Sequence, residues 1–233
     1  MPPDGTPGSW AIAELTRLLG ALAPEPRHWW QRRSRQTPDR AVDVVATLAS
    51  WSTQQLITVD AVARWPRWRH ASEPLPPLVA RGDLGACLLA SMAPDGRLRA
   101  AAVAVLRRHS APVAHRMLAL RAGDWVGPIR TAARTALAQV TPETAPAAGP
   151  VLVALRDRAH GADALAQYAA ATQAALGRPL AALLVAAPDR TAHRWAWSEL
   201  IAAGMPPQGL IRLIEDAEDQ WVASRAIAAV VAS

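Results

Sequence analysis

Apolar residues recur at intervals of three and four along most of the chain, which is the period of an amphipathic helix. We expect helices over residues 10–23, 38–52 and 53–63, the last capped by Thr53, and a proline-rich loop at 66–78. From residue 83 onward, short apolar helices alternate with longer ones. The short helices are expected at residues 84–92, 112–120, 151–158, 180–187 and 210–214. The pattern predicts an all-α protein.

A repeated motif opens the longer helices. An aspartate stands in or near the preceding turn at Asp95, Asp124, Asp163, Asp189 and Asp219. An arginine follows at Arg99, Arg130, Arg194 and Arg225. An aspartate in such a turn can cap a helix by accepting hydrogen bonds from backbone amides. We expect the arginines to pair with aspartates of neighbouring units, so that a ladder of ion pairs runs along the stack.

The best copy of this unit is Asp124-Trp125-Val126, with Ile129-Arg130, Ala133 and Ala136-Leu137 after it. It resembles a HEAT repeat of the PBS lyase-type HEAT-like family. The resemblance covers residues 83–233 in about five units, although Ala169 stands where an arginine is expected. It implies an α-solenoid of helix pairs with a right-handed superhelix. Residues 1–82 would form N-terminal capping helices or degenerate repeats, and residues 83–233 one continuous array.

Composition narrows the classes of function. The chain has 233 residues and a net charge of +6, and all 25 of its basic residues are arginine. This usage is typical of a bacterial genome of high G+C content. The single cysteine, Cys87, excludes an internal disulfide and lies in an apolar helix, where we expect a buried, inert thiol. No leader or membrane span is recognisable, so we expect a cytoplasmic protein.

Catalytic signatures are weak throughout. The chain has no glycine-rich phosphate loop, no Gly-x-Ser-x-Gly elbow and no His-Glu-x-x-His pair, and its six histidines are scattered. We therefore expect a protein that is not an enzyme and that holds no metal or cofactor.

Arginine and tryptophan supply the candidates for binding. Residues 97–134 hold eight arginines and one acid, whereas residues 199–219 hold five acids and one arginine, a polarity that could steer an acidic partner. The HEAT resemblance implies that second helices line a concave face. The candidates for that face are Trp125, Arg130, Arg134, Trp195 and Arg99. Trp195 and Trp197 are two residues apart, so at most one of them is expected in the groove.

Two classes of function follow. The first is a non-enzymatic scaffold that binds a protein partner through its concave surface. The alternative is a DNA-binding module related to the alkylpurine DNA glycosylases built on HEAT-like repeats, in which Asp124 would face the sugar. Residues 28–35 and 65–70 interleave tryptophan with arginine, as nucleic-acid binders and end caps both do. A lesser possibility is a bilin-lyase role.

The last helix, about residues 221–232, has an apolar end without a polar outer face. We expect it to dock onto another chain or onto further repeats.

Overall fold

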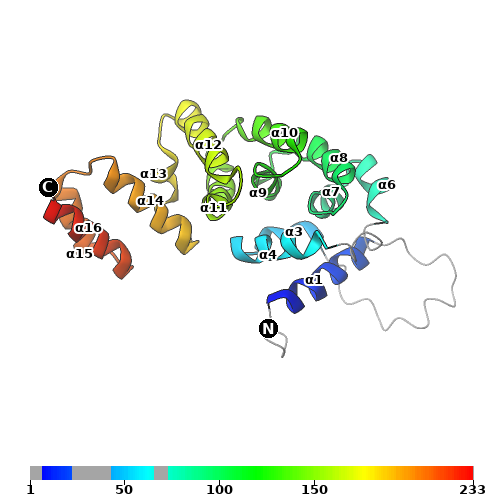
Figure 1. The fold of residues 1–233 in the computed structure, drawn as a ribbon, viewed down its shortest axis with the longest axis horizontal. Coiled ribbons are helices and arrows are strands. Elements are labelled where there is room, and N and C mark those ends of the chain that lie inside the picture. Colours follow the sequence, from blue (N-terminus) through cyan, green and yellow to red (C-terminus); the bar gives the residue numbers. More distant parts are fainter. Residues whose placement is uncertain (1–6, 23–42, 66–72, 233) are drawn as a thin grey trace. The chain divides into compact units, whose positions relative to one another are not determined.

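The computed structural model describes residues 7–22, 43–65 and 73–232 (Figure 1). Within these ranges the protein has 14 helices and no strand, which confirms the all-α prediction. The chain divides into two compact units, residues 1–137 and 138–233, and each is described by itself. The predicted basic segment at 28–35 and most of the one at 65–70 lie outside the described residues.

Unit 1 is built around two buried helices. Its elements are α1 (Pro7–Leu22), α3 (Val44–Ser50), α4 (Thr53–Ala63), α6 (Leu75–Ala80), α7 (Leu84–Ala90), α8 (Gly96–Leu106), α9 (Pro112–Arg121) and α10 (Gly127–Leu137). Helices α7 and α9 pack against α3 on one side and against α8 and α10 on the other (Figure 1). Nearly every residue of α7 and α9 is therefore buried.

The N-terminal helices share this core. Helix α1 packs on α4, and α3 packs on both α7 and α9. Arg116 of α9 also donates hydrogen bonds to carbonyl oxygens of Leu48, Ala49 and Trp51, at the end of α3. These contacts join residues on both sides of the predicted boundary at 82/83. That residues 83–233 form one continuous array stays a prediction.

Unit 2 begins with another buried helix. Its elements are α11 (Ala145–Leu155), α12 (Gly161–Leu176), α13 (Leu180–Leu184), α14 (Arg190–Ala202), α15 (Pro207–Asp216) and α16 (Gln220–Ala232). Helix α11 packs against α12, α13 and α14. Helices α14, α15 and α16 enclose a second core of Leu210, Leu213, Val222 and Ala226, against which Trp197 and Trp221 pack. The residues expected to form one array thus belong to two units.

Capping explains several helix starts. The side chains of Asp95 and Asp189 accept from backbone amides at the start of α8 and α14, as the motif predicts. Helix α4 is capped by Ser52, one residue before the Thr53 that the sequence suggested, and Gln55 completes a capping box. Helix α6 begins inside the predicted loop and ends two residues beyond it, because prolines are tolerated in the first turn of a helix.

Helix α12 departs from the motif. It begins after His160, whose φ is 63°, and Asp163 lies exposed in its first turn instead of capping it. Gly161 is required here, since an added Cβ would lie 1.9 Å from the carbonyl oxygen of Leu155. The predicted role of Asp163 as the opening aspartate is therefore corrected.

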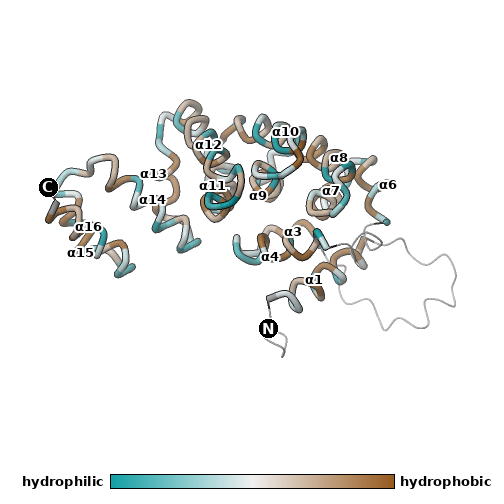
Figure 2. The backbone as a smooth tube through the Cα atoms, viewed as in Figure 1, coloured by the Kyte–Doolittle hydropathy of each residue, from teal (hydrophilic) through white to brown (hydrophobic). Residues whose placement is uncertain are grey.

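Hydropathy follows this packing. Figure 2 shows apolar stretches interleaved with polar ones along the helices of both units. In the described part of the chain, no helix combines the length and apolarity that crossing a bilayer demands. Cys87 is buried as expected, and burial raises the pKa of its thiol to about 11. Helix α16 leaves Ile227 and Val231 exposed; whether another chain covers them stays a prediction.

Candidate functional site

A buried ion pair links successive helix pairs of unit 1. Arg99 of α8 donates to Asp124, in the turn before α10, from Nε to Oδ2 at 3.2 Å and from Nη2 to Oδ1 at 3.3 Å. Its Nη1 donates to the carbonyl oxygens of Ala93 and Pro94, so the guanidinium is held on all sides. The Asp124 carboxylate also accepts from the backbone amide of Val126. This pairing, over 25 residues, is the contact that the ladder predicted.

Three further residues extend the pair into a network. Arg121 of α9 donates to Oδ2 of Asp124 at 3.1 Å and also to Asp60 of α4. Arg64, at the end of α4, donates to Asp60 at 3.2 Å and lies 3.8 Å from Asp124. Only Arg64 reaches the surface, with 31% of its side chain exposed. The network ties α4 to α8 and α9, which lie more than 30 residues further along the chain.

Sequence reasoning missed Asp60, Arg64 and Arg121. A signal was present, because Asp60 interrupts the apolar stripe of α4 and Arg121 ends the apolar helix α9. A charged residue on a buried face requires a partner of opposite charge. Two such residues in one chain could have been matched with each other.

Burial and pairing shift the pKa of Asp124 in opposite directions. Burial alone raises the pKa of its carboxyl, but the Val126 amide, Arg121 and Arg99 stabilise the charged form and lower the net pKa. Burial lowers the pKa of the Arg121 guanidinium, an effect that Asp60 and Asp124 oppose. The network therefore depends on Asp124 remaining charged.

Unit 2 carries a second copy of the pair. Arg194 of α14 donates to Asp219 from Nε at 2.8 Å and from Nη2 at 2.9 Å, again over 25 residues. Arg190 adds a third contact at 3.1 Å, and the amide of Trp221 donates to the same carboxylate. The arginine hydrogen bonds hold the pKa of Asp219 well below its usual value. The Trp221 ring lies against the guanidinium groups of Arg194 and Arg225, at 5.4 and 5.8 Å.

The candidates for partner contact have different surroundings. Arg99 is only 1% exposed, so its assignment to a binding face is corrected: it belongs to the ion-pair motif. Arg130 and Arg134 are half-buried and donate to the carbonyl oxygens of Asp124 and Ala122. Trp125 is 70% exposed, with its ring 5.7 Å from the Arg99 guanidinium. Trp195 is half-buried, and it is Trp197 that lines a cavity of unit 2.

The basic stretch of residues 97–134 is mostly engaged within unit 1. Five of its eight arginines donate to carboxylates or carbonyl oxygens: Arg99, Arg116, Arg121, Arg130 and Arg134. The guanidinium groups of Arg97, Arg107 and Arg108 have no partner among the described residues, and all three are exposed. The part of this charge that is available to a partner is therefore confined to α8 and its C-terminal end.

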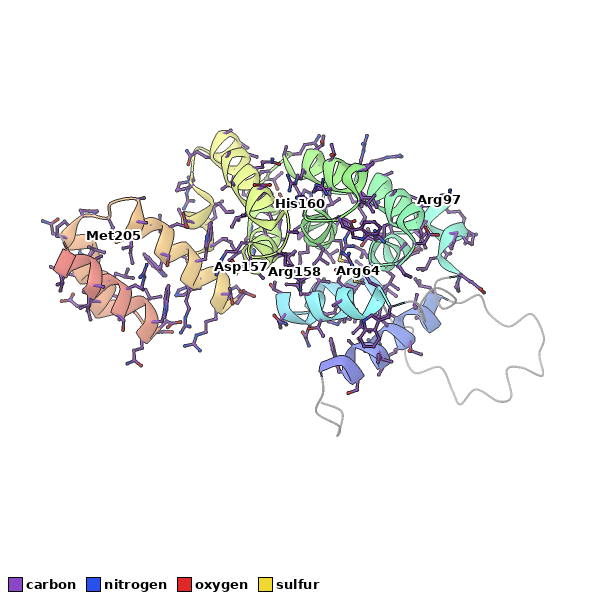
Figure 3. The ribbon with its side chains drawn as sticks, viewed as in Figure 1. Arg64, Arg97, Asp157, Arg158, His160 and Met205 are labelled. Carbon is purple, nitrogen blue, oxygen red and sulfur yellow. The ribbon has the colours of Figure 1, made fainter. Side chains whose placement is uncertain are left out.

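Two of these free arginines border a groove of about 690 Å³ between α6 and α8. Its apolar surface comes from Pro76, Val79, Ala80, Leu98, Ala101, Ala104 and Val105. Arg97 and Arg108 lie at the two ends of the α8 wall, and Arg81 follows α6; Figure 3 labels Arg97 beside these helices. The one carboxylate, Asp95, is bound to the backbone amide of Arg97 as a helix cap. The groove is thus apolar along its length and positive at its rim.

A second cavity, of about 810 Å³, lies between α14, α15 and α16. His193 and Trp197 pack edge to face on its wall, and Asp216, Glu218 and Arg212 bring charges of both signs to it. Because a carbonyl oxygen only accepts, Nδ1 of His193 donates to Val185, at 2.6 Å. The mixed charge of this cavity favours no single class of ligand.

In the ranges that the structure describes, no group of three or more His, Cys, Asp or Glu side chains could hold a metal ion. Asp124 is 1% exposed and surrounded by guanidinium groups, so it is closed to a nucleic-acid sugar. Comparison of the chain with protein-family models, with curated proteins and with solved structures finds no match.

Proposed function

We propose that the protein is a non-enzymatic scaffold of HEAT-like helix pairs, wound as a right-handed solenoid, that binds a protein partner in the cytoplasm. The all-helical fold and the recurrence of one Arg–Asp pair at a spacing of 25 residues in both units support the repeat architecture. Repeat folds of this kind offer extended surfaces rather than enclosed pockets, which suits a binding role.

The composition of the α6–α8 groove indicates the class of partner. The α6–α8 groove combines an apolar surface with three arginines, Arg81, Arg97 and Arg108, whose guanidinium groups have no partner among the described residues. An apolar centre with a charged rim is the usual composition of a protein interface. An acidic partner would neutralise these arginines and cover the groove. Trp125, exposed beside the start of α10, is a second candidate anchor.

The DNA-acting alternative finds less support. A glycosylase-like mechanism needs a carboxylate that reaches the sugar, whereas Asp124 is occupied by Arg99 and Arg121. The equivalent Asp219 is likewise held by Arg194 and Arg190. No feature of either site favours a bilin-lyase role.

The test is photocrosslinking in cells of the native host. A photoreactive amino acid at position 101 lies in the groove, and one at position 100 of the same helix faces solvent outside it. We expect one protein to crosslink in stoichiometric yield from position 101 and much more weakly from position 100. Equal labelling from both positions, or crosslinks to nucleic acid alone, would contradict the proposal.

A further inference from the structure

The shape and charge of the α6–α8 groove restrict what can fill it. We propose that it binds an amphipathic α-helix of the partner, with an apolar side facing the groove and acidic residues near both ends. This inference rests on the proposed function and specifies the partner element.

Alanine and branched aliphatic side chains form the α8 wall. Leu98, Ala101, Ala104 and Val105 recur at helical spacing along one stripe, and Arg97 and Arg108 extend the stripe at its two ends. Val79 and Ala80 of α6 line the opposite wall. Alanine at such positions lets another helix approach closely, at interaxial distances of about 8–10 Å. The α8 stripe therefore forms an apolar track, and the six-residue helix α6 lies beside it.

Backbone chemistry favours a helical occupant over an extended one. The walls are α-helices, whose internal amides and carbonyls are already hydrogen-bonded to each other. An extended peptide would bring unpaired N–H and C=O groups against the apolar track, and leaving each without a partner is costly. A helix satisfies these groups internally and can bury one apolar face.

The arginines set the spacing of the acidic residues. Arg97 and Arg108 are eleven residues apart on one helical stripe, which corresponds to about 16 Å along the axis. A helix lying along α8 would match them with two carboxylates about ten or eleven residues apart. Arg81, on the α6 side, would meet a third acid on the flank of that helix.

Nucleic acid would fit the arginines but not the track between them. The described residues that line the groove include no aromatic side chain on which a base could stack. A sugar-phosphate backbone would leave the alanine, leucine and valine surface without an apolar cover. A protein helix uses both features of the groove.

The experiment selects binders to the full chain from a displayed library of random peptides of about 20 residues, enough for a helix of about 30 Å. We expect enrichment of helix-forming sequences that carry Asp or Glu about ten or eleven residues apart, with Ala or Leu between them. Affinities are then measured by fluorescence anisotropy for the chain and four variants.

The variants come in matched pairs. Ala101→Trp blocks the track, whereas Ala100→Trp adds the same side chain to an exposed position outside it. Arg97→Glu with Arg108→Glu reverses the rim charge, and Arg107→Glu changes a neighbouring exposed arginine that does not line the groove. We expect Ala101→Trp and the double reversal each to weaken binding about tenfold or more, and each control to change it less than about threefold.

Several results would overturn the inference: no enriched peptide, enrichment of proline- and glycine-rich or basic sequences, or equal losses in Ala100→Trp and Ala101→Trp. Tight binding of a DNA duplex that is lost in the double reversal, without any selected peptide, would assign the groove to nucleic acid. If position 101 crosslinks a protein but the selected peptides are extended, the scaffold function stands and the helix inference fails.

Discussion

The two units contain the same ion pair at the same spacing in different surroundings. Arg99 and Asp124 of unit 1 are buried and joined by a second arginine and a second aspartate. Arg194 and Asp219 of unit 2 form the better bidentate geometry and are more exposed, with 30% of the Arg194 side chain and 12% of the Asp219 side chain accessible. The motif thus specifies a contact between successive helix pairs, while its surroundings decide how much stability depends on it.

The largest effect that should separate the units is neutralisation of the aspartate. Asp124→Asn leaves Arg99 and Arg121 buried without a full counter-charge, which we expect to lower the free energy of unfolding by about 3–5 kcal/mol. Asp219→Asn should cost far less, because water can solvate Arg194 and Arg190. Urea denaturation of both variants measures the difference, and equal losses would refute the contrast.

A double-mutant cycle should sharpen the account of the buried network. Asp60→Leu or Arg121→Met alone removes one partner, and we expect each to cost about 2–4 kcal/mol in unfolding free energy. The double variant removes both charges of this contact and should cost less than the sum of the two single losses, although Asp124 then keeps Arg99 but loses Arg121. Additive losses in urea denaturation would mean that the Asp60–Arg121 contact is not the source of the cost.

The two tryptophans that follow the aspartates differ in burial, so removing each side chain should change stability by a different amount. Trp221 is half-buried against the second core and its ring lies close to two guanidinium groups, so Trp221→Ala should cost about 2 kcal/mol. Trp125 is mostly exposed, and Trp125→Ala should change stability by less than about 0.5 kcal/mol. Thermal unfolding of the two variants checks this order; a larger loss for Trp125→Ala would contradict it.

Acid should destabilise unit 1 by protonating Asp124. The pKa of Asp124 is lower in the folded state than its usual value of 3.8, so its stabilisation is fully present above that value. This stabilisation is lost as the pH falls below 3.8 towards the folded pKa. Asp124→Asn should therefore flatten the pH dependence of stability in that range, as seen by denaturation at a series of pH values. An unchanged slope would show that Asp124 is not the titrating group.

A smaller effect is expected at His115 of α9. Its ring is buried, its Nδ1 has no partner among the described residues, and burial lowers its pKa below the usual value of 6.5. The unfolded chain then binds more protons, so stability falls as the pH drops below 6.5. His115→Leu should remove this slope between neutral and mildly acidic pH while keeping the Asp124 slope. Persistence of the first slope would assign it to another histidine.

The sequence predicted the helices well, because each is written locally in apolar spacing and capping residues. The Arg99–Asp124 and Arg194–Asp219 pairs followed from a repeat at fixed spacing. Asp163 does not cap α12 as the motif predicts. Its distance of 33 residues from Arg130 already departs from the spacing of 25 in the two pairs.

The groove was not predictable in the same way. The sequence pattern indicates no role for Arg81, and most of α6 lies in the predicted proline-rich loop. The α6 wall of the groove therefore could not be predicted. The basic stretch suggested eight available charges, yet five of these arginines are engaged within unit 1. Arg99, Arg116 and Arg121 are engaged by contacts over 25 to 68 residues, which local pattern does not encode. Arg130 and Arg134 are engaged over only 6 and 12 residues.

The network and the groove are connected through α8. Arg99 anchors one face of this helix to Asp124, while Arg97, Ala101 and Arg108 line the groove. We infer that the buried network links α8 to α4 and α9 through Asp124 and so fixes one wall of the α6–α8 groove. Hydrogen exchange followed by mass spectrometry tests it most directly, in the parent chain, Asp124→Asn and Asp219→Asn. We predict that Asp124→Asn speeds exchange in α4, α8 and α9 together and leaves α14–α16 unchanged, while Asp219→Asn acts only on α14 and α16. Faster exchange confined to the turn at Asp124, or spread equally over both units, would contradict the account.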